Sequence, residues 1–164
     1  IKFRNGSSRI LVATDLAARG IDITELKFIV HYELPHRIEE FTHRNGRTAR
    51  VNELGTAYVL KWDKEKLPEF IEASTPIKIN PSKRLGDPFW ETLFISGGRK
   101  DKISKGDIAG LFFKQGDLKR DQLGDIELKQ DCAFVAVPKS LSKELANKLN
   151  NTRLKKKKVR ITVL

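Results

Sequence analysis

The chain has 164 residues, of which 39% are hydrophobic and 32% are charged, and its formal net charge is +11. This length suits one ordinary domain or two small ones, and no apolar run reaches the roughly 20 residues that a membrane-spanning helix needs. The single cysteine, Cys132, excludes an internal disulfide. We therefore expect a protein of a reducing compartment, the cytoplasm, with no membrane partner.

The positive charge is concentrated in the second half of the chain. Residues 91–164 hold 17 basic and 9 acidic side chains, a net charge of +8, and residues 1–90 carry the remaining +3. A basic excess on one small domain is typical of proteins that bind polyanions such as RNA. A well-solvated surface without such a partner is the alternative at this point.

The first half of the chain alternates strand-like and helix-like segments. Short apolar runs rich in β-branched residues predict strands at residues 9–13, 27–31 and 55–61. Helices are predicted at residues 38–48 and 63–73. Strands that alternate with helices indicate an α/β fold with a parallel sheet.

The segment ATDLAARGID, residues 13–22, follows the first predicted strand with a turn rich in small residues. Small residues at the carboxyl end of a strand let backbone amides approach a ligand, and α/β sheets bind ligands at that edge. The carboxylate of Asp22 can accept hydrogen bonds from a ribose hydroxyl. A tight structural turn with a capping aspartate is the alternative interpretation.

The segment HRNGRTAR, residues 43–50, is the most distinctive cationic run. In a helix, His43, Arg47 and Arg50 fall within roughly 60° of one another. Guanidinium groups suit phosphate oxygens and stabilise charge on a transferred γ-phosphoryl group. The alternative is a solvated basic helix whose partners are acidic neighbours such as Glu39 and Glu40.

Residues 75–90 predict a linker, since they contain three prolines and many polar residues. The region 91–164 then follows the order β-α-β-β-α-β. Its predicted strands are 92–96, 124–128, 132–137 and 159–164, and its predicted helices are 105–114 and 142–150. About 70 residues in this order can close into one sheet with two helices behind it. RNA-recognition (RRM-like) domains use this order, as do many unrelated ferredoxin-like domains.

Two kinds of side chain in the region 91–164 suit contact with RNA. Cations gather in a glycine-hinged loop and before the last strand, where they can bind phosphates; they are Arg99, Lys100, Lys102, Lys105, Lys155, Lys156, Lys157 and Lys158. Phe94 and Phe134 are the candidates for base stacking on the two central strands, with Cys132 where a second aromatic normally lies. Solvated loops are the alternative for both basic clusters.

Residues 13–22 and 43–50, in this order and at this separation, resemble motifs V and VI of DEAD-box RNA helicases. The run FIVHYELPHRIEEFTHRNGRTAR is also similar, almost residue for residue. The resemblance covers residues 1–73. It implies that residues 1–74 are the C-terminal portion of the second RecA-like domain of such a helicase.

The resemblance also implies roles for individual residues. Arg47 and Arg50 match the arginines that reach the γ-phosphate of ATP, and Asp22 matches an aspartate on the ribose side. The remaining matches concern RNA-backbone contact and coupling of the two core domains; they are Thr14, Arg19 and Gly20 for RNA, and His43 and Arg44 for coupling. One departure is Asn45, where the family usually has Ile or Ser, and it puts none of these roles in doubt.

No GxxxxGK[ST] phosphate-binding loop and no DEAD sequence occurs in the 164 residues. The groups that hold Mg²⁺ and the β- and γ-phosphates are therefore absent from this chain. The resemblance implies ATP and Mg²⁺ as cofactors of a full-length protein. The chain alone is predicted to bind RNA, to hold no cofactor and to hydrolyse no ATP.

Residues 92–164 resemble the RNA-binding domain of DbpA-type DEAD-box helicases, most of all through LFISGGRKDKISKGDIAGL. The resemblance implies binding to a hairpin of 23S ribosomal RNA in the peptidyl-transferase region. It further implies that the domain tethers the helicase to pre-50S particles, where the core remodels RNA during large-subunit assembly. Three alternatives stay open: a cold-shock DEAD-box helicase with broad RNA targets, a non-enzymatic RNA-binding adaptor, and a ferredoxin-like protein-interaction domain.

Overall fold

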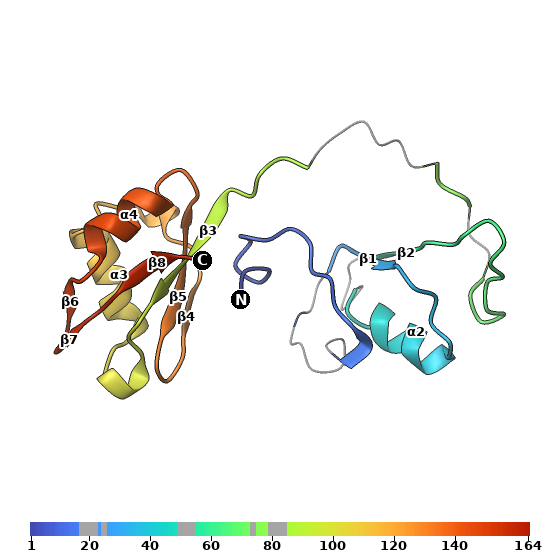
Figure 1. The fold of residues 1–164 in the computed structure, drawn as a ribbon, viewed down its shortest axis with the longest axis horizontal. Helices are drawn as coiled ribbons and strands as arrows, with labels where there is room; N and C mark the ends of the chain where they lie inside the picture. The colour runs from blue at the N-terminus through green and yellow to red at the C-terminus, as the bar shows by residue number, and fades with distance from the viewer. Residues whose placement is uncertain (17–22, 24–25, 49–54, 73–74, 79–84) are drawn as a thin grey trace. The chain divides into compact units, whose positions relative to one another are not determined.

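The computed structural model describes residues 1–16, 23, 26–48, 55–72, 75–78 and 85–164. Contacts divide the chain into two compact units (Figure 1). One unit is Val12–Lys83, and the other is Arg84–Leu164 together with Ile1–Leu11. No helix in the described ranges is long and apolar enough to cross a membrane.

The unit Val12–Lys83 is built around two parallel strands and a helix. Strand β1, Phe28–His31, pairs with β2, Thr56–Val59, so that His31 lies opposite Val59. Helix α2, Ile38–Asn45, lies between them in the sequence, as parallel neighbours require a crossover connection. This βαβ arrangement confirms the predicted α/β organisation with a parallel sheet.

Two elements predicted in the first half of the chain are wrong. Residues 9–13 form no strand, and Val12 is 93% exposed. A parallel strand needs hydrogen-bonded neighbours, and among the described residues the parallel sheet contains only β1 and β2. Within the predicted helix 63–73, the described residues form separate turns, because Pro68 lacks an N–H and its ring disfavours helical geometry before it.

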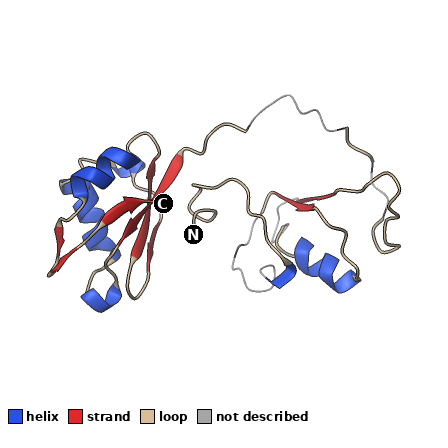
Figure 2. Cartoon of the chain, viewed as in Figure 1, coloured by secondary structure: helices blue, strands red, loops and turns tan. Residues whose placement is uncertain are grey.

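The second unit contains a four-stranded antiparallel sheet of order β4-β5-β3-β8 with two helices on one face (Figure 2). The strands are β3, Trp90–Ile95; β4, Ile126–Leu128; β5, Ala133–Pro138; and β8, Ile161–Val163. The helices are α3, Lys105–Lys114, and α4, Ser142–Leu149. The β-α-β-β-α-β order predicted for this region is confirmed.

Three short elements were not predicted in this unit. Two are single 3₁₀ turns, η1 at Arg99–Asp101 and η2 at Arg120–Gln122. The third is a hairpin of two-residue strands, β6, Arg153–Leu154, and β7, Lys157–Lys158. The hairpin turns through Lys155, whose φ of 56° lies in the left-handed region.

The core of this unit lies between the sheet and the two helices. Alternate strand residues such as Leu93, Ile95 and Val135 are fully buried against Phe112 of α3 and Leu149 of α4. Burial of each such side chain contributes about 1.5–3 kcal/mol. The intervening residues of the strands point to the opposite face, which is the face that RNA-recognition domains use for bases.

Residues 1–8 form a compact turn that packs against this opposite face. Asn5 Nδ2 donates to Thr92 Oγ1 over 2.8 Å, and Arg4 Nη2 lies 2.5 Å from Glu127 Oε2. Lys2 Nζ donates to the carbonyl of Leu164 over 2.8 Å. Thr92 is therefore fully buried although its side chain points away from the helices.

Candidate nucleotide and RNA sites

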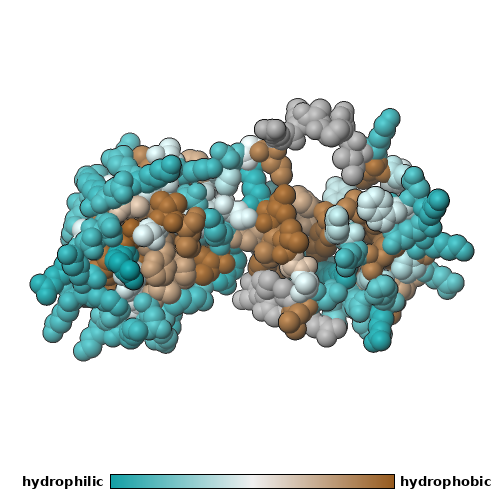
Figure 3. Space-filling view, viewed as in Figure 1, coloured by the Kyte–Doolittle hydropathy of each residue, from teal (hydrophilic) through white to brown (hydrophobic). Residues whose placement is uncertain are grey.

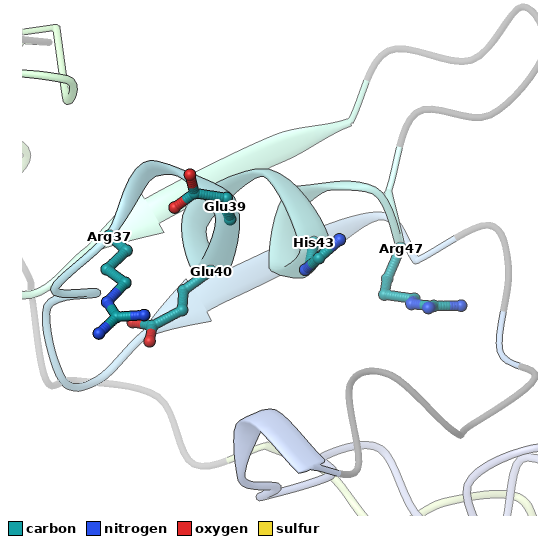
Figure 4. A pocket seen from close by; sticks show the side chains of 5 residues that line it. All are labelled: Arg37, Glu39, Glu40, His43 and Arg47. Atoms are coloured by element: carbon teal, nitrogen blue, oxygen red, sulfur yellow. The ribbon is translucent and has the colours of Figure 1, made fainter.

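Helix α2 and the turn after it carry the cationic residues of the predicted nucleotide site. His43 is exposed near the end of the helix, and Arg47 is half-buried in the turn, because α2 ends at Asn45 instead of continuing to residue 48. Both line an open cavity of about 620 Å³ (Figure 4). The rest of its lining comes from Arg37, Glu39 and Glu40.

Arg44 fastens α2 to two other segments of the same unit. Its Nε and Nη2 donate to the two carboxylate oxygens of Asp15 over 2.5 and 2.8 Å. Its Nη1 donates to the carbonyl of Glu33 over 2.8 Å. The hydrogen bond to Asp15 raises the pKa of Arg44, so the guanidinium stays charged and the two-pronged pair is retained.

Sequence reasoning missed two partners in this network. Asp15 lies in the motif V segment but had no predicted role, and His31 ends β1 as a buried residue with 1% exposure. His31 Nε2 lies 2.9 Å from Asn45 Oδ1, so the unusual residue of motif VI has a specific partner. The signal available in the sequence was an ionisable residue at the end of an otherwise apolar strand.

The structure describes only part of the predicted site around motif V. Thr14 is exposed and belongs to no strand. The other predicted residues around motif V lie outside the described residues, as does Arg50 of the motif VI segment; the motif V residues are Asp22, Arg19 and Gly20.

In the second unit, ion pairs bring the two predicted basic segments together. Lys157 Nζ lies 2.8 Å from Asp101 Oδ2, and Lys155 Nζ lies 3.1 Å from Asp107 Oδ1. The hydrogen bond from Lys157 lowers the pKa of Asp101, and the bond from Ser104 lowers the pKa of Asp107. The β6–β7 hairpin therefore packs beside η1 and the start of α3.

Close backbone packing shapes the loop between β3 and α3. Arg99 N–H donates to the Lys129 carbonyl, and Lys100 N–H donates to the Gln130 carbonyl, each over 3.0 Å. A Cβ on Gly98 would lie 2.3 Å from the Gln130 carbonyl oxygen, so only glycine fits there. Asp101 Oδ2 accepts from Gly98 N–H over 3.0 Å. The loop thus has a defined conformation against the β4–β5 turn.

Several cations of the loop after β3 and of the β6–β7 hairpin remain available for a ligand. Lys100 pairs with Asp131. Within the part of the chain that the structure describes, the other exposed cations of the cluster make no ion pair; they are Arg99, Lys102, Lys105, Lys156 and Lys158. We call these five residues the basic surface. Hydrophilic side chains surround a hydrophobic patch on the visible face of this unit (Figure 3).

The two candidate stacking residues are direct cross-strand neighbours. Phe94 lies opposite Phe134, with ring centroids 5.8 Å apart and an interplanar angle of 61°, and both are half-buried. Glu127 lies next in register to Phe134 on β4. The hydrogen bond from Lys129 and the charge of Arg4 lower the pKa of Glu127, so its carboxylate stays ionised and paired with these two cations.

Comparisons with known proteins identify two families in the chain. Residues 92–163 match the family described as DbpA RNA binding domain, and residues 1–52 match the helicase conserved C-terminal domain. The ATP-dependent RNA helicase DbpA of Escherichia coli strain K12 is 33% identical over 172 residues, which cover 100% of this chain and 38% of that protein. ATP-dependent RNA helicase DbpA of Bacillus subtilis strain 168 is 28% identical over 191 residues, with 98% and 40% covered.

Another relative aligns with a smaller share of the chain. ATP-dependent RNA helicase mak-5 of Neurospora crassa is 49% identical over 67 residues, which cover 41% of this chain and 8% of that protein. The chain spans about two fifths of the length of the two DbpA relatives, and each of them aligns with nearly all of it. The chain therefore belongs to the DbpA type of DEAD-box RNA helicase, of which it carries the end of the helicase C-terminal domain followed by the DbpA RNA binding domain.

Proposed function

We propose that this chain is the C-terminal region of an ATP-dependent RNA helicase that binds 23S ribosomal RNA in the cytoplasm and remodels pre-50S particles. The observation that carries the RNA part is the basic surface. It lies on a domain similar to DbpA RNA binding domains, where two ion pairs hold the β6–β7 hairpin beside η1 and α3. Five cations without carboxylate partners in the described residues give a concentrated site for phosphate oxygens. Membership of the DbpA type favours the hairpin in the peptidyl-transferase region as the target.

The basic surface is the main RNA contact in this proposal, and the lysines that pair with acids position it. Lys155 and Lys157 hold the hairpin beside η1, while Lys100 holds the loop beside Asp131. Phe94 and Phe134 stack bases only as a secondary contact, since residues 1–8 pack against the same face of the sheet through Asn5 and Arg4. Specific docking then raises the local concentration of the helicase core on neighbouring duplexes.

The nucleotide part of the proposal concerns the first unit. Arg47 and Arg50 would neutralise charge on the γ-phosphate during transfer, and Asp22 would hold the ribose. Thr14, Arg19 and Gly20 would contact the RNA backbone, and His43 with Arg44 would couple the two core domains. Mg²⁺ and the phosphate-binding loop come from the part of a full-length helicase that this chain does not contain. We therefore propose that the chain alone hydrolyses no ATP.

The test is a competition binding experiment at physiological salt with the 164-residue chain. It compares the ribosomal hairpin with an unrelated hairpin of equal length and charge. A preference of about 100-fold, equivalent to about 2.7 kcal/mol, is expected for a sequence-specific target. Equal affinity would contradict the ribosomal target and favour the cold-shock type. RNA-stimulated ATP turnover by the purified chain would contradict its proposed inactivity.

A further inference from the structure

A buried histidine lies at the centre of the contacts that hold the arginine helix. His31 is 1% exposed at the end of β1 and packs its ring against Phe41 of α2, with ring centroids 5.0 Å apart. Its Nε2 lies 2.9 Å from Asn45 Oδ1, and its Nδ1 lies 3.5 Å from Arg44 Nη1. Both ring nitrogens therefore face the last turn of the helix that leads into Arg47.

The partners fix which nitrogen carries the proton. A guanidinium has only donors, so the nitrogen that faces Arg44 must be an acceptor. Nδ1 is then unprotonated, and Nε2–H donates to the amide oxygen of Asn45. The neutral Nε2–H tautomer is the one form of His31 that satisfies both partners.

Protonation would disturb this arrangement. A proton on Nδ1 would set an N–H donor against the Arg44 guanidinium and place two cations 3.5 Å apart. The charged groups that face His31 are Arg44, whose charge opposes protonation, and Asp15, whose carboxylate favours it. Burial, the largest effect, lowers the pKa of His31, so the neutral ring prevails at neutral pH.

We propose that His31 is a positioning residue for the nucleotide-facing arginines: as a neutral donor to Asn45 and acceptor from Arg44, it sets the place of α2 against β1. Arg44 then reaches Asp15 of the motif V segment, and the turn that begins at Gly46 directs Arg47. The inference rests on the proposed ATPase function, because only a full-length helicase turns this positioning into catalysis. Asn45 is one half of this contact, which gives a role to the residue that departs from the family pattern.

The kinetic test uses three variants of the full-length helicase. His31→Leu fills the buried site with an apolar side chain and loses both hydrogen bonds, so kcat for RNA-stimulated ATP hydrolysis should fall about 10- to 100-fold with little change in KM. His31→Asn keeps an acceptor for Arg44 at the position of Nδ1 but its shorter amide does not reach Asn45, so its kcat should fall less than that of His31→Leu. The matched control is His36→Asn, at an exposed histidine before α2. This substitution should change neither kcat nor KM.

The pH profile separates positioning from simple packing. Wild-type kcat should decline on the acid side as His31 gains a proton, and this decline should be absent in His31→Asn, which cannot be protonated. An unchanged kcat in His31→Leu would overturn the proposal. An acid limb that persists unaltered in His31→Asn would overturn it as well, even if His31→Leu fails to fold.

A spectroscopic test does not depend on ATPase activity. In the 164-residue chain, the imidazole nitrogen shifts of His31 should report the Nε2–H tautomer and a midpoint below 6.5, the ordinary histidine value. An Nδ1–H tautomer, or a midpoint above 6.5, contradicts the positioning role. If the full-length protein hydrolyses no ATP while these shifts are as expected, the proposed function fails and the hydrogen-bonded arrangement stands.

Discussion

Lys157 Nζ and Asp101 Oδ2 lie 2.8 Å apart, and this ion pair joins the β6–β7 hairpin to the loop that follows β3. The same carboxylate oxygen accepts from Gly98 N–H, so one acidic residue both closes the loop and docks the hairpin. An acid at the centre of a basic surface reduces the net attraction to RNA. Its contribution must therefore be to hold the cations in place.

The first prediction concerns Asp101, whose charge weakens the attraction to RNA while its contacts hold the cations in place. Asp101→Asn raises the net charge by one, and an attraction that depended on charge alone would tighten RNA binding. We expect weaker binding instead, since the hairpin and loop lose their shared partner. Asp121→Asn in η2 is the matched control, because Asp121 is exposed and makes no ion pair within the described residues, and its RNA affinity should be unchanged or slightly higher. Titration of labelled hairpin RNA measures both variants; tighter binding by Asp101→Asn would contradict the positional role.

The second prediction concerns the basic surface itself. Lys105→Ala should weaken RNA binding for all sequences alike and reduce the salt slope of the binding constant by about one unit. Lys143→Ala removes an exposed lysine of α4 that is not part of the basic surface, and should leave the slope unchanged. Affinities measured over a series of salt concentrations test the difference. Equal salt slopes for the two variants would mean that RNA is attracted by the net charge of the domain and not by the basic surface in particular.

The third prediction uses two glycines of the same domain. Gly98→Ala places a Cβ 2.3 Å from the Gln130 carbonyl oxygen, and we expect a loss of about 1–3 kcal/mol in the free energy of unfolding. Gly110→Ala meets nothing within 4 Å inside α3, where alanine is the better helix former, and should gain about 0.5–1 kcal/mol. Chemical denaturation of the 164-residue chain measures both. Equal effects of the two substitutions would mean that the loop opens to accept the methyl group.

The fourth prediction concerns the aromatic pair on the sheet. Phe94→Leu and Phe134→Leu, singly and together, form a double-mutant cycle for rings 5.8 Å apart. We expect a coupling of about 0.5–1.5 kcal/mol in the free energy of unfolding, as is usual for edge-to-face rings. If base stacking is secondary, the same variants should lower RNA affinity less than Lys105→Ala does. A larger loss of affinity would make the sheet the main RNA surface.

The second unit was predictable because local and long-range signals agree there. Ser104 caps α3 in a reciprocal arrangement with Asp107, and the helix has the predicted bounds Lys105–Lys114. The predicted strand 92–96 is present as part of β3, in which Leu93 and Ile95 are buried in the core and Phe94 lies on the other face. The β6–β7 hairpin escaped prediction because its run of lysines has no apolar alternation, and its ion pairs join residues about 50 positions apart.

The first unit was predicted less well because its strands depend on partners. Residues 9–13 have the composition of a buried strand, yet β-branched residues favour a strand only where another strand supplies hydrogen bonds. The predicted helix 63–73 fails at Pro68, a signal that was present in the sequence. The role of His31 could not be predicted from the sequence, because its partners Arg44 and Asn45 lie more than ten residues away. Only their geometry in the folded chain selects one tautomer.

The last prediction is a pH dependence of stability that His31 confers. Its pKa in the folded chain is lowered from 6.5, chiefly by burial, while in the unfolded chain it keeps the ordinary value. The unfolded state therefore binds more protons at and below pH 6.5, and the free energy of unfolding must fall as the pH drops through this range. Well above pH 6.5 the ring is neutral in both states and contributes no pH dependence. Thermal unfolding of the wild-type chain and of His31→Asn between pH 7.5 and 5 should show the wild type losing more stability on acidification, whereas parallel curves would assign the acid sensitivity to other groups.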